Sequence, residues 1–255
     1  MDDLPVYVWA VVLIGVIGIP ASTCLALYRG AHAARLGPRR AALVAGGAAA
    51  LLAGWLVVSA VLADNFVYRQ RPGETRPWLG VAVAGVLLAL LASTRIPLVA
   101  RTLTAPGAAA RLTMPHTLRF AGVAFLIVMA LGHLPAVFAL PAGLGDMAIA
   151  VAAPVIAYRL AAGTGHRAAV WFNVLGLADL VVALSIGVTV GYRLVVVTPS
   201  AESLSLLPLT LIPTTAVPLL LALHIVSLRH LAAAARTGPT TEPARPREPH
   251  PTVPR

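Results

Sequence analysis

The chain has 255 residues with a mean hydropathy of +0.87, and only 11% are charged, against about 25% in a typical soluble domain, so an ordinary soluble enzyme is excluded. All nineteen basic residues are Arg, and without Lys the chain can form no retinal Schiff base, pyridoxal phosphate aldimine or Walker A phosphate loop. Its single cysteine, Cys24, excludes an intramolecular disulfide and a thiolate metal cluster.

Apolar runs long enough to cross a membrane recur along the chain. A helix of about 20 apolar residues spans a hydrocarbon core of about 30 Å. Seven segments meet this requirement, which predicts an all-α polytopic helical bundle over residues 1–234. The expected spans are 6–28, 41–63, 78–99, 120–140, 140–158, 168–192 and 204–228.

The distribution of Arg predicts the orientation of this bundle. Fifteen Arg lie in the connections and tail on one side of the expected membrane, and four lie on the other. Because short cytoplasmic loops retain positive charge, we expect the N-terminus outside and the C-terminus in the cytoplasm. Asp2 and Asp3, rather than a basic segment, precede the first span, which favours a retained helix over a cleaved signal peptide.

The last 21 residues, 235–255, are rich in Pro and Arg and lack apolar periodicity. This pattern predicts a disordered cytoplasmic tail. We expect the cytoplasmic Arg residues to contact anionic lipid headgroups, and we expect no nucleic acid partner because membrane orientation accounts for the charge. The heavy use of Ala, Gly, Pro and Arg is typical of a GC-rich bacterial genome, which indicates a bacterial plasma membrane.

Several polar side chains fall within the expected spans. Such groups are costly in a membrane and generally face a bundle interior or a cavity, so they are the first candidates for function. Three of them stand out, His133, Asp146 and Asp179, with Asn173, His224 and Arg119 as supporting polar groups.

One candidate site lies near the expected bilayer midplane. Asp179 lies near the centre of span 168–192, at the depth of the Pro213–Pro218 segment in span 204–228. Two prolines there predict a broken helix whose freed carbonyls, with Thr214, Thr215 and Asn173, could bind a solute or a proton. The alternative is a kinked packing helix in which the threonine hydroxyls bond to its own carbonyls.

A second candidate site lies in the expected outer half of the membrane. His133 and Asp146 have similar expected depths there and could form an acid/base pair, or alternatively a structural lock between two helices. Arg119, at the start of span 120–140, could bind a lipid phosphate or a carboxylate, or serve as an interface anchor.

Two segments share the pattern Gly-Leu-small-Asp, Gly143–Ala150 and Gly176–Ala183. They lie on neighbouring antiparallel spans, which is compatible with an inverted repeat, and the small residues before each Asp would permit close helix contact.

Gly143–Asp146 also resembles the GxGD motif of intramembrane aspartic proteases and prepilin peptidases, over these four residues only. That resemblance implies a second membrane Asp within a few ångströms. The expected depths of Asp146 and Asp179 differ by about 10 Å, which argues against such a dyad. His133 and His224 fall in opposite membrane halves and cannot share a zinc ion, so neither a metal nor another cofactor is expected.

Three functional hypotheses follow. The leading one is small-solute or proton-linked transport or binding at a midplane site formed by Asp179 and the broken helix Pro213–Pro218. The second is an enzyme that acts on a lipid or lipid-linked substrate at the outer face through Asp146 and His133. The third is a structural or sensory membrane subunit.

Overall fold

The computed structural model describes residues 4–69 and 76–236, and within these ranges it contains helices and no strands. The predicted all-α class is therefore confirmed. The elements are α1 (Val6–Ala33), α2 (Pro38–Asp64), α3 (Trp78–Ser93), α4 (Pro97–Leu103), α5 (Ala108–Thr113), η1 (Met114–Gly122), α6 (Val123–Ala130), α7 (Ala136–Ala161), α8 (His166–Gly191), η2 (Glu202–Ser205), η3 (Ile212–Ala216) and α9 (Val217–Arg236).

Several of these elements are long and apolar enough to cross a membrane. Among the described residues, six helical segments meet this condition, and the segments Ala108–Ala130 and Ile212–Arg236 each combine successive elements. A seventh crossing is possible if α3 and α4 are counted as one span, although they meet at a bend of 87°.

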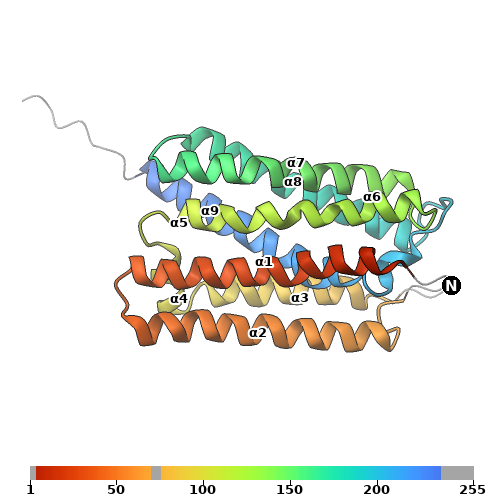
Figure 1. Cartoon of the computed structure of the whole chain (residues 1–255), viewed down its shortest axis with the longest axis horizontal. Coiled ribbons are helices and arrows are strands. Elements are labelled where there is room, and N and C mark those ends of the chain that lie inside the picture. Colours follow the sequence, from red (N-terminus) through yellow and green to blue (C-terminus); the bar gives the residue numbers. More distant parts are fainter. Residues whose placement is uncertain (1–3, 70–75, 237–255) are drawn as a thin grey trace, which may run out of the picture.

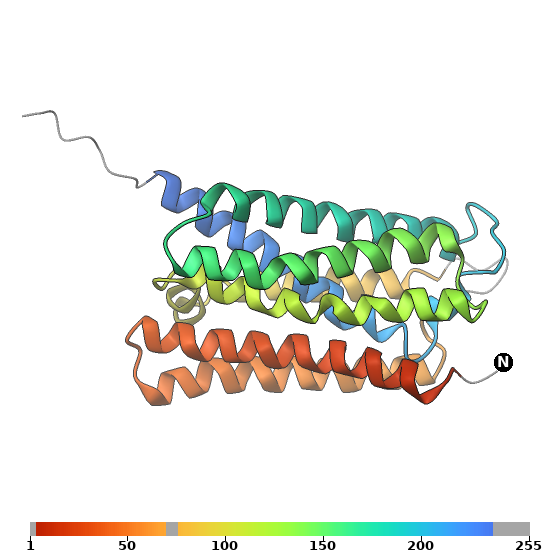
Figure 2. The same ribbon diagram turned by 45° about the horizontal axis from the view of Figure 1, so that its top comes forward.

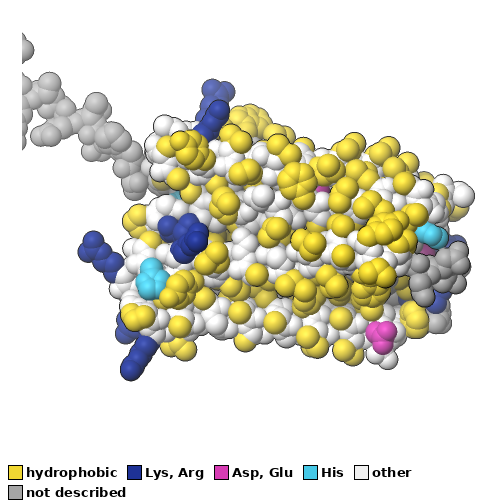
Figure 3. Space-filling model, viewed as in Figure 1, with side chains coloured by type: hydrophobic (Ala, Val, Ile, Leu, Met, Phe, Trp, Pro, Cys, Tyr) yellow, Lys and Arg dark blue, Asp and Glu magenta, His cyan; other side chains and the backbone are white. Residues whose placement is uncertain are grey.

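The helices form an elongated bundle with α9 running through its middle. In Figure 1, α1, α2 and α3 lie on one side of the bundle, and α6, α7 and α8 lie on the other. Figure 2 shows α1 and α2 side by side along one edge of the bundle. Helix α9 packs against α3, α5 and α8, while α1 packs against both α2 and η1. The face shown in Figure 3 is hydrophobic along its length, and Arg side chains gather at the end where α9 finishes.

Two predicted boundaries in the middle of the chain were wrong. Spans 120–140 and 140–158 correspond to helical segments Ala108–Ala130 and Ala136–Ala161. The sequence stays apolar from residue 120 to 142, although the chain turns between α6 and α7. Gly132, with a φ of 80°, and Pro135, the residue before α7, make this turn. Only glycine adopts such a φ without strain, so this residue was the available signal.

Two further spans also differ from their predicted limits. Span 78–99 ends as a helix at Ser93, because the chain bends and Pro97 occupies the first turn of α4. Span 204–228 begins as a continuous helix only at Ile212 and continues to Arg236. The predicted tail therefore starts within α9, and its remainder, residues 237–255, lies outside the described residues, as do Asp2 and Asp3.

A glycine allows α1 to approach η1 closely. A Cβ atom added to Gly15 would overlap the side chain of Ala121, whereas one added to Gly54 on α2 would meet no atom within 4 Å. Gly15 is buried in α1, but Gly54 is exposed.

We therefore expect Gly15→Ala to destabilise the protein by about 1–3 kcal/mol, the usual cost of overpacking a close contact. The matched control Gly54→Ala should leave stability unchanged or raise it, because Ala is the better helix former. Thermal unfolding of both purified variants in mild detergent, followed by circular dichroism, measures the difference. Equal midpoints for the two variants would contradict the close packing of α1 on η1.

Candidate functional site

Arg119 lies at the centre of the candidate site. It is only 1% exposed and is located near the midpoint of the helical segment Ala108–Ala130. Of the roles predicted for Arg119, that of an interface anchor was wrong, because its helical segment begins twelve residues earlier than predicted. The alternative role, binding a carboxylate, is met by carboxylates of the chain itself. The local element of Arg119 is η1, a 3₁₀ helix of nine residues. Since such runs rarely exceed three or four residues, η1 marks an unusual segment of the bundle.

Two carboxylates from neighbouring helices bind the Arg119 guanidinium. Nε donates to Oδ1 of Asp146 on α7 at 2.6 Å, and Nη2 donates to Oδ2 of Asp179 on α8. Both aspartates lie near the midpoints of their helices. Arg119, Asp146 and Asp179 therefore form a charged cluster, here called the Arg–Asp cluster, at the middle of the bundle.

The predicted pair of His133 and Asp146 is not formed. Asp146 lies ten residues after the start of α7, about 15 Å along the helix, and its partner is Arg119. His133 lies in the turn before α7, where its carbonyl accepts a hydrogen bond from the Ser203 hydroxyl at 3.0 Å. The pairing was wrong because α7 starts earlier than the predicted fifth span.

The two aspartates lie closer together than their predicted depths indicated. Both bind one guanidinium, so the expected depth difference of about 10 Å was wrong. Each carboxylate nevertheless accepts a hydrogen bond from a different nitrogen of Arg119. In an aspartic protease dyad the two carboxylates instead share a proton, and here the guanidinium lies where that proton would be. The geometry therefore differs from that of the GxGD proteases.

His224 continues the cluster on the opposite side of Arg119. The Asn173 amide donates from Nδ2 to the Ala169 carbonyl at 2.8 Å, so its Oδ1 accepts from His224 Nδ1 at 2.9 Å. This tautomer leaves His224 Nε2 unprotonated, and that nitrogen accepts from Arg119 Nη1 at 3.3 Å. His224 is therefore neutral in this arrangement. The predicted position of His224, in the membrane half opposite to His133, was wrong, because His224 is the middle residue of the helical segment Ile212–Arg236.

His116 is a member of the site that sequence analysis missed. Its ring stacks on that of His224 with centroids 3.9 Å apart, and Phe172 meets it edge-on at 5.7 Å. His116 is 1% exposed, and neither ring nitrogen has a hydrogen-bond partner among the described residues. It fell outside predicted span 120–140, although its spacing of three residues from Arg119 places both on one face of a 3₁₀ helix.

Glycines allow the helices to close around these side chains. Added Cβ atoms at Gly122, Gly145 and Gly176 would overlap Asp146, Asp179 and His224, respectively. Each glycine lies on a different helix from the side chain that it accommodates. For Gly145, the residue before Asp146, this confirms the expectation that a small residue at this position permits close helix contact.

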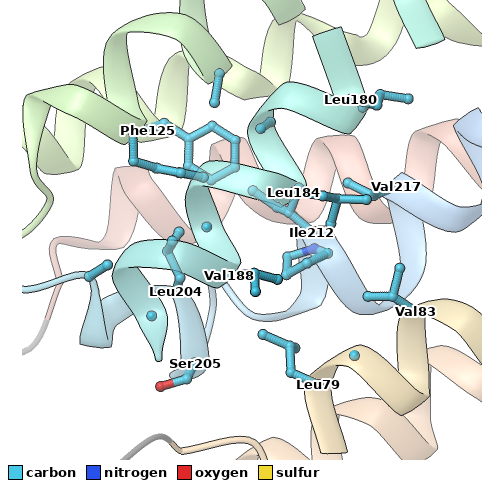
Figure 4. A pocket seen from close by; sticks show the side chains of 18 of the residues that line it. Leu79, Val83, Phe125, Leu180, Leu184, Val188, Leu204, Ser205, Ile212 and Val217 are labelled. Carbon is cyan, nitrogen blue, oxygen red and sulfur yellow. The ribbon is translucent and has the colours of Figure 1, made fainter. Parts of the chain in front are cut away.

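A cavity of about 320 Å³, here called the cleft, extends from the two aspartates. Asp146 and Asp179 border it with side chains 13% and 17% exposed, and the remaining lining is almost entirely apolar. Figure 4 shows side chains of α3, α8 and η3 facing one another across the cleft, among them Leu79, Val188 and Ile212. Val188 is itself 47% exposed, so the cleft reaches the surface of the bundle.

The walls of the cleft are α3 and α8. Both pack more extensively against α9 than against each other. Tyr192, Ala201 and Ser205 line the end of the cleft at the α8 C-terminus. Arg119, whose side chain is fully buried, is not among the residues that line it.

The Pro213–Pro218 segment differs from the predicted midplane break. Pro213 lies in the first turn of η3, a π-helical turn at the start of the last span, rather than at its centre. The Thr214 and Thr215 hydroxyls donate to the Thr210 and Leu211 carbonyls, which is the kinked-helix alternative. Neither threonine lines the cleft, so the structure does not bring them to Asp179 as a binding site.

Removing the Arg119 charge should strongly destabilise the bundle. Arg119→Leu leaves two carboxylates buried without a cation, which typically costs about 3–5 kcal/mol. The control is Arg69→Leu, since the Arg69–Glu202 pair is about a third exposed and should contribute less than about 1 kcal/mol. Thermal unfolding in detergent compares the two variants. A loss in Arg119→Leu no larger than in Arg69→Leu would contradict the central role of the Arg–Asp cluster.

Comparison with known proteins gives one match. Residues 76–232 match a family described as a domain of unknown function, DUF8737. No curated protein and no solved structure matches the chain. The matched region covers more than half of the chain and includes the Arg–Asp cluster, His224 and both walls of the cleft. The chain therefore belongs to the DUF8737 family.

Proposed function

We propose that this chain is an integral membrane protein that binds a small solute in the cleft and transports it across the membrane. The observation that carries this proposal is the position of Asp146 and Asp179. They lie near the middle of two long apolar helices and form the only charged part of a cleft lined by described residues that are otherwise apolar or uncharged. Small-molecule sites commonly combine an apolar pocket with a few polar groups that orient the ligand.

The energetics of the Arg–Asp cluster favour a functional role. Burying three charges is costly, and replacing a buried ion network by well-packed apolar residues is often neutral or stabilising. Charged side chains within a membrane commonly mark substrate or ion pathways. A cluster that borders a cleft is thus better explained by binding than by stability alone.

We propose that the N-terminus lies outside the plasma membrane of a bacterium and the C-terminus lies in the cytoplasm. With Arg119 assigned to the bundle interior, fourteen Arg remain on the proposed cytoplasmic side against four outside. In this orientation Tyr192 and Ser205 lie at the outer end of the cleft. The solute would therefore enter from the outer half of the membrane.

The alternative enzyme hypothesis has less support. It depends on acid/base chemistry between Asp146 and His133, but Asp146 is bound to Arg119 and His133 lies in the turn before α7. The structural or sensory hypothesis differs from the proposal in predicting no uptake of the bound compound into liposomes.

Native mass spectrometry of the purified protein tests occupancy of the cleft. We expect wild-type protein to retain a bound small molecule, and Leu184→Trp to lose it because Leu184 lines the cleft and a larger ring would fill it. The control is Val182→Trp, on the exposed face of the same helix, where the side chain is 48% exposed. Val182→Trp should retain the adduct at the wild-type level.

Transport is then measured with the retained compound in liposomes that contain the protein. Asp179→Asn should abolish its uptake, whereas Glu202→Gln, which alters the partly exposed Arg69–Glu202 pair, should not. Adducts that are equal in wild type and Leu184→Trp would contradict binding in the cleft. A retained adduct with no uptake would instead favour the sensory hypothesis.

A further inference from the structure

The cleft has an apolar body and an acidic end. Aliphatic side chains of α3, α8 and α9 line it. Phe125 and Phe138 also line it and form an edge-to-face pair with ring centroids 5.3 Å apart. Asp146 and Asp179 are the only ionisable carboxylic acids among the described residues that line it. A ligand that fills the cleft therefore presents mostly apolar surface, and its polar group meets carboxylates.

The charge balance of the Arg–Asp cluster indicates the sign of that polar group. Arg119 supplies one positive charge to two carboxylates, and His224 is neutral because its Nε2 accepts from Arg119. The cluster thus contains one acid more than it has cations. That extra acid must either hold a proton or be balanced by a cation from the cleft.

The position of the charges in the cleft disfavours an anionic ligand. The Arg119 side chain is fully buried and does not line the cleft, so a carboxylate or phosphate would face Asp146 and Asp179 rather than the guanidinium. Repulsion between like charges in a surrounding of low dielectric constant opposes such binding.

The surroundings of the cleft favour entry from the lipid phase. Walls α3 and α8 pack more extensively against α9 than against each other, and Val188 of the cleft lining is 47% exposed. The loop after Tyr192 adds Leu194 and Val196, which are 73% and 85% exposed. Apolar side chains at this end suit the boundary between headgroups and acyl chains.

We propose that the cleft binds an amphipathic cation, an apolar or aromatic body that carries one ammonium group, with the ammonium held by Asp146 and Asp179. This inference rests on the proposed function, since it names the class of solute for the same cleft. The ammonium donates hydrogen bonds to carboxylate oxygens, and the body occupies the space between α3 and α8.

Three matched probes test the charge of the ligand. They are 3-phenylpropylamine, 3-phenylpropan-1-ol and 3-phenylpropanoate, which share a phenyl body and differ in their polar group. Equilibrium dialysis against the full chain in detergent gives each Kd. We expect the amine to bind at least about tenfold more tightly than the alcohol, because a charge-assisted hydrogen bond replaces a neutral one. The propanoate should bind most weakly.

Variants separate failure of this inference from failure of the proposed function. Asp179→Asn should weaken the amine to about the level of the alcohol and leave the alcohol unchanged. Leu184→Trp should weaken both. An alcohol that binds wild type as tightly as the amine, and is lost in Leu184→Trp, would overturn the cationic ligand while retaining the cleft.

Binding of either probe that Leu184→Trp leaves unchanged would overturn both proposals. A propanoate that binds most tightly, and is lost in Leu184→Trp, would overturn the cationic ligand while retaining the cleft. The comparison of the three probes on wild type needs no substitution, so it decides the sign of the charge even if Asp179→Asn does not fold. Glu202→Gln is the control for a general loss of negative charge, and the amine should bind it like wild type.

Discussion

The guanidinium of Arg119 is the constraint on which the arrangement of the bundle depends. A guanidinium buried in the middle of a bundle needs hydrogen-bond partners on several sides. Helices α7, α8 and α9 each supply one, which are Asp146, Asp179 and His224, respectively. The partners must come close, which explains the glycines where the helices meet these side chains. The nine-residue 3₁₀ segment η1 presents Arg119 and His116 on the same side. Position, packing and local helix geometry thus follow from a single buried cation.

Much of the fold was predictable because the long apolar runs of this chain coincide with its long helices. The limits of α1, α2 and α8 lie within a few residues of the predicted spans, apart from an extra turn at the end of α1. The errors arose where an apolar run continues through a turn. Between α6 and α7 the chain stays apolar, so Gly132 and Pro135 were weak signals against a strong hydropathy pattern.

Those boundary errors determined which parts of the candidate site could be predicted. Asp146, Asp179 and Asn173 were predicted to be unusual polar residues within apolar spans. Their partners could not be predicted, because the expected depth of each residue depended on where its helix starts. A shift of the fourth span by twelve residues moved Arg119 from the expected interface to the midpoint of a helix. Residue type thus predicted which side chains were unusual, whereas pairing required the structure.

If the chain is inserted in a membrane, as proposed, the Arg–Asp cluster bears on the free energy of that insertion. A single Arg or Asp at the centre of an isolated helix raises the free energy of insertion by about 2.5–3.5 kcal/mol. The segments that carry Arg119, Asp146 and Asp179 follow one another along the chain, and η1 packs closely on α7. If these segments inserted together, Arg119 would pair with Asp146 and Asp179 before any of the three side chains faced lipid. In the proposed membrane location, the short connections 131–135 and 162–165 would keep each charge beside its partner during synthesis.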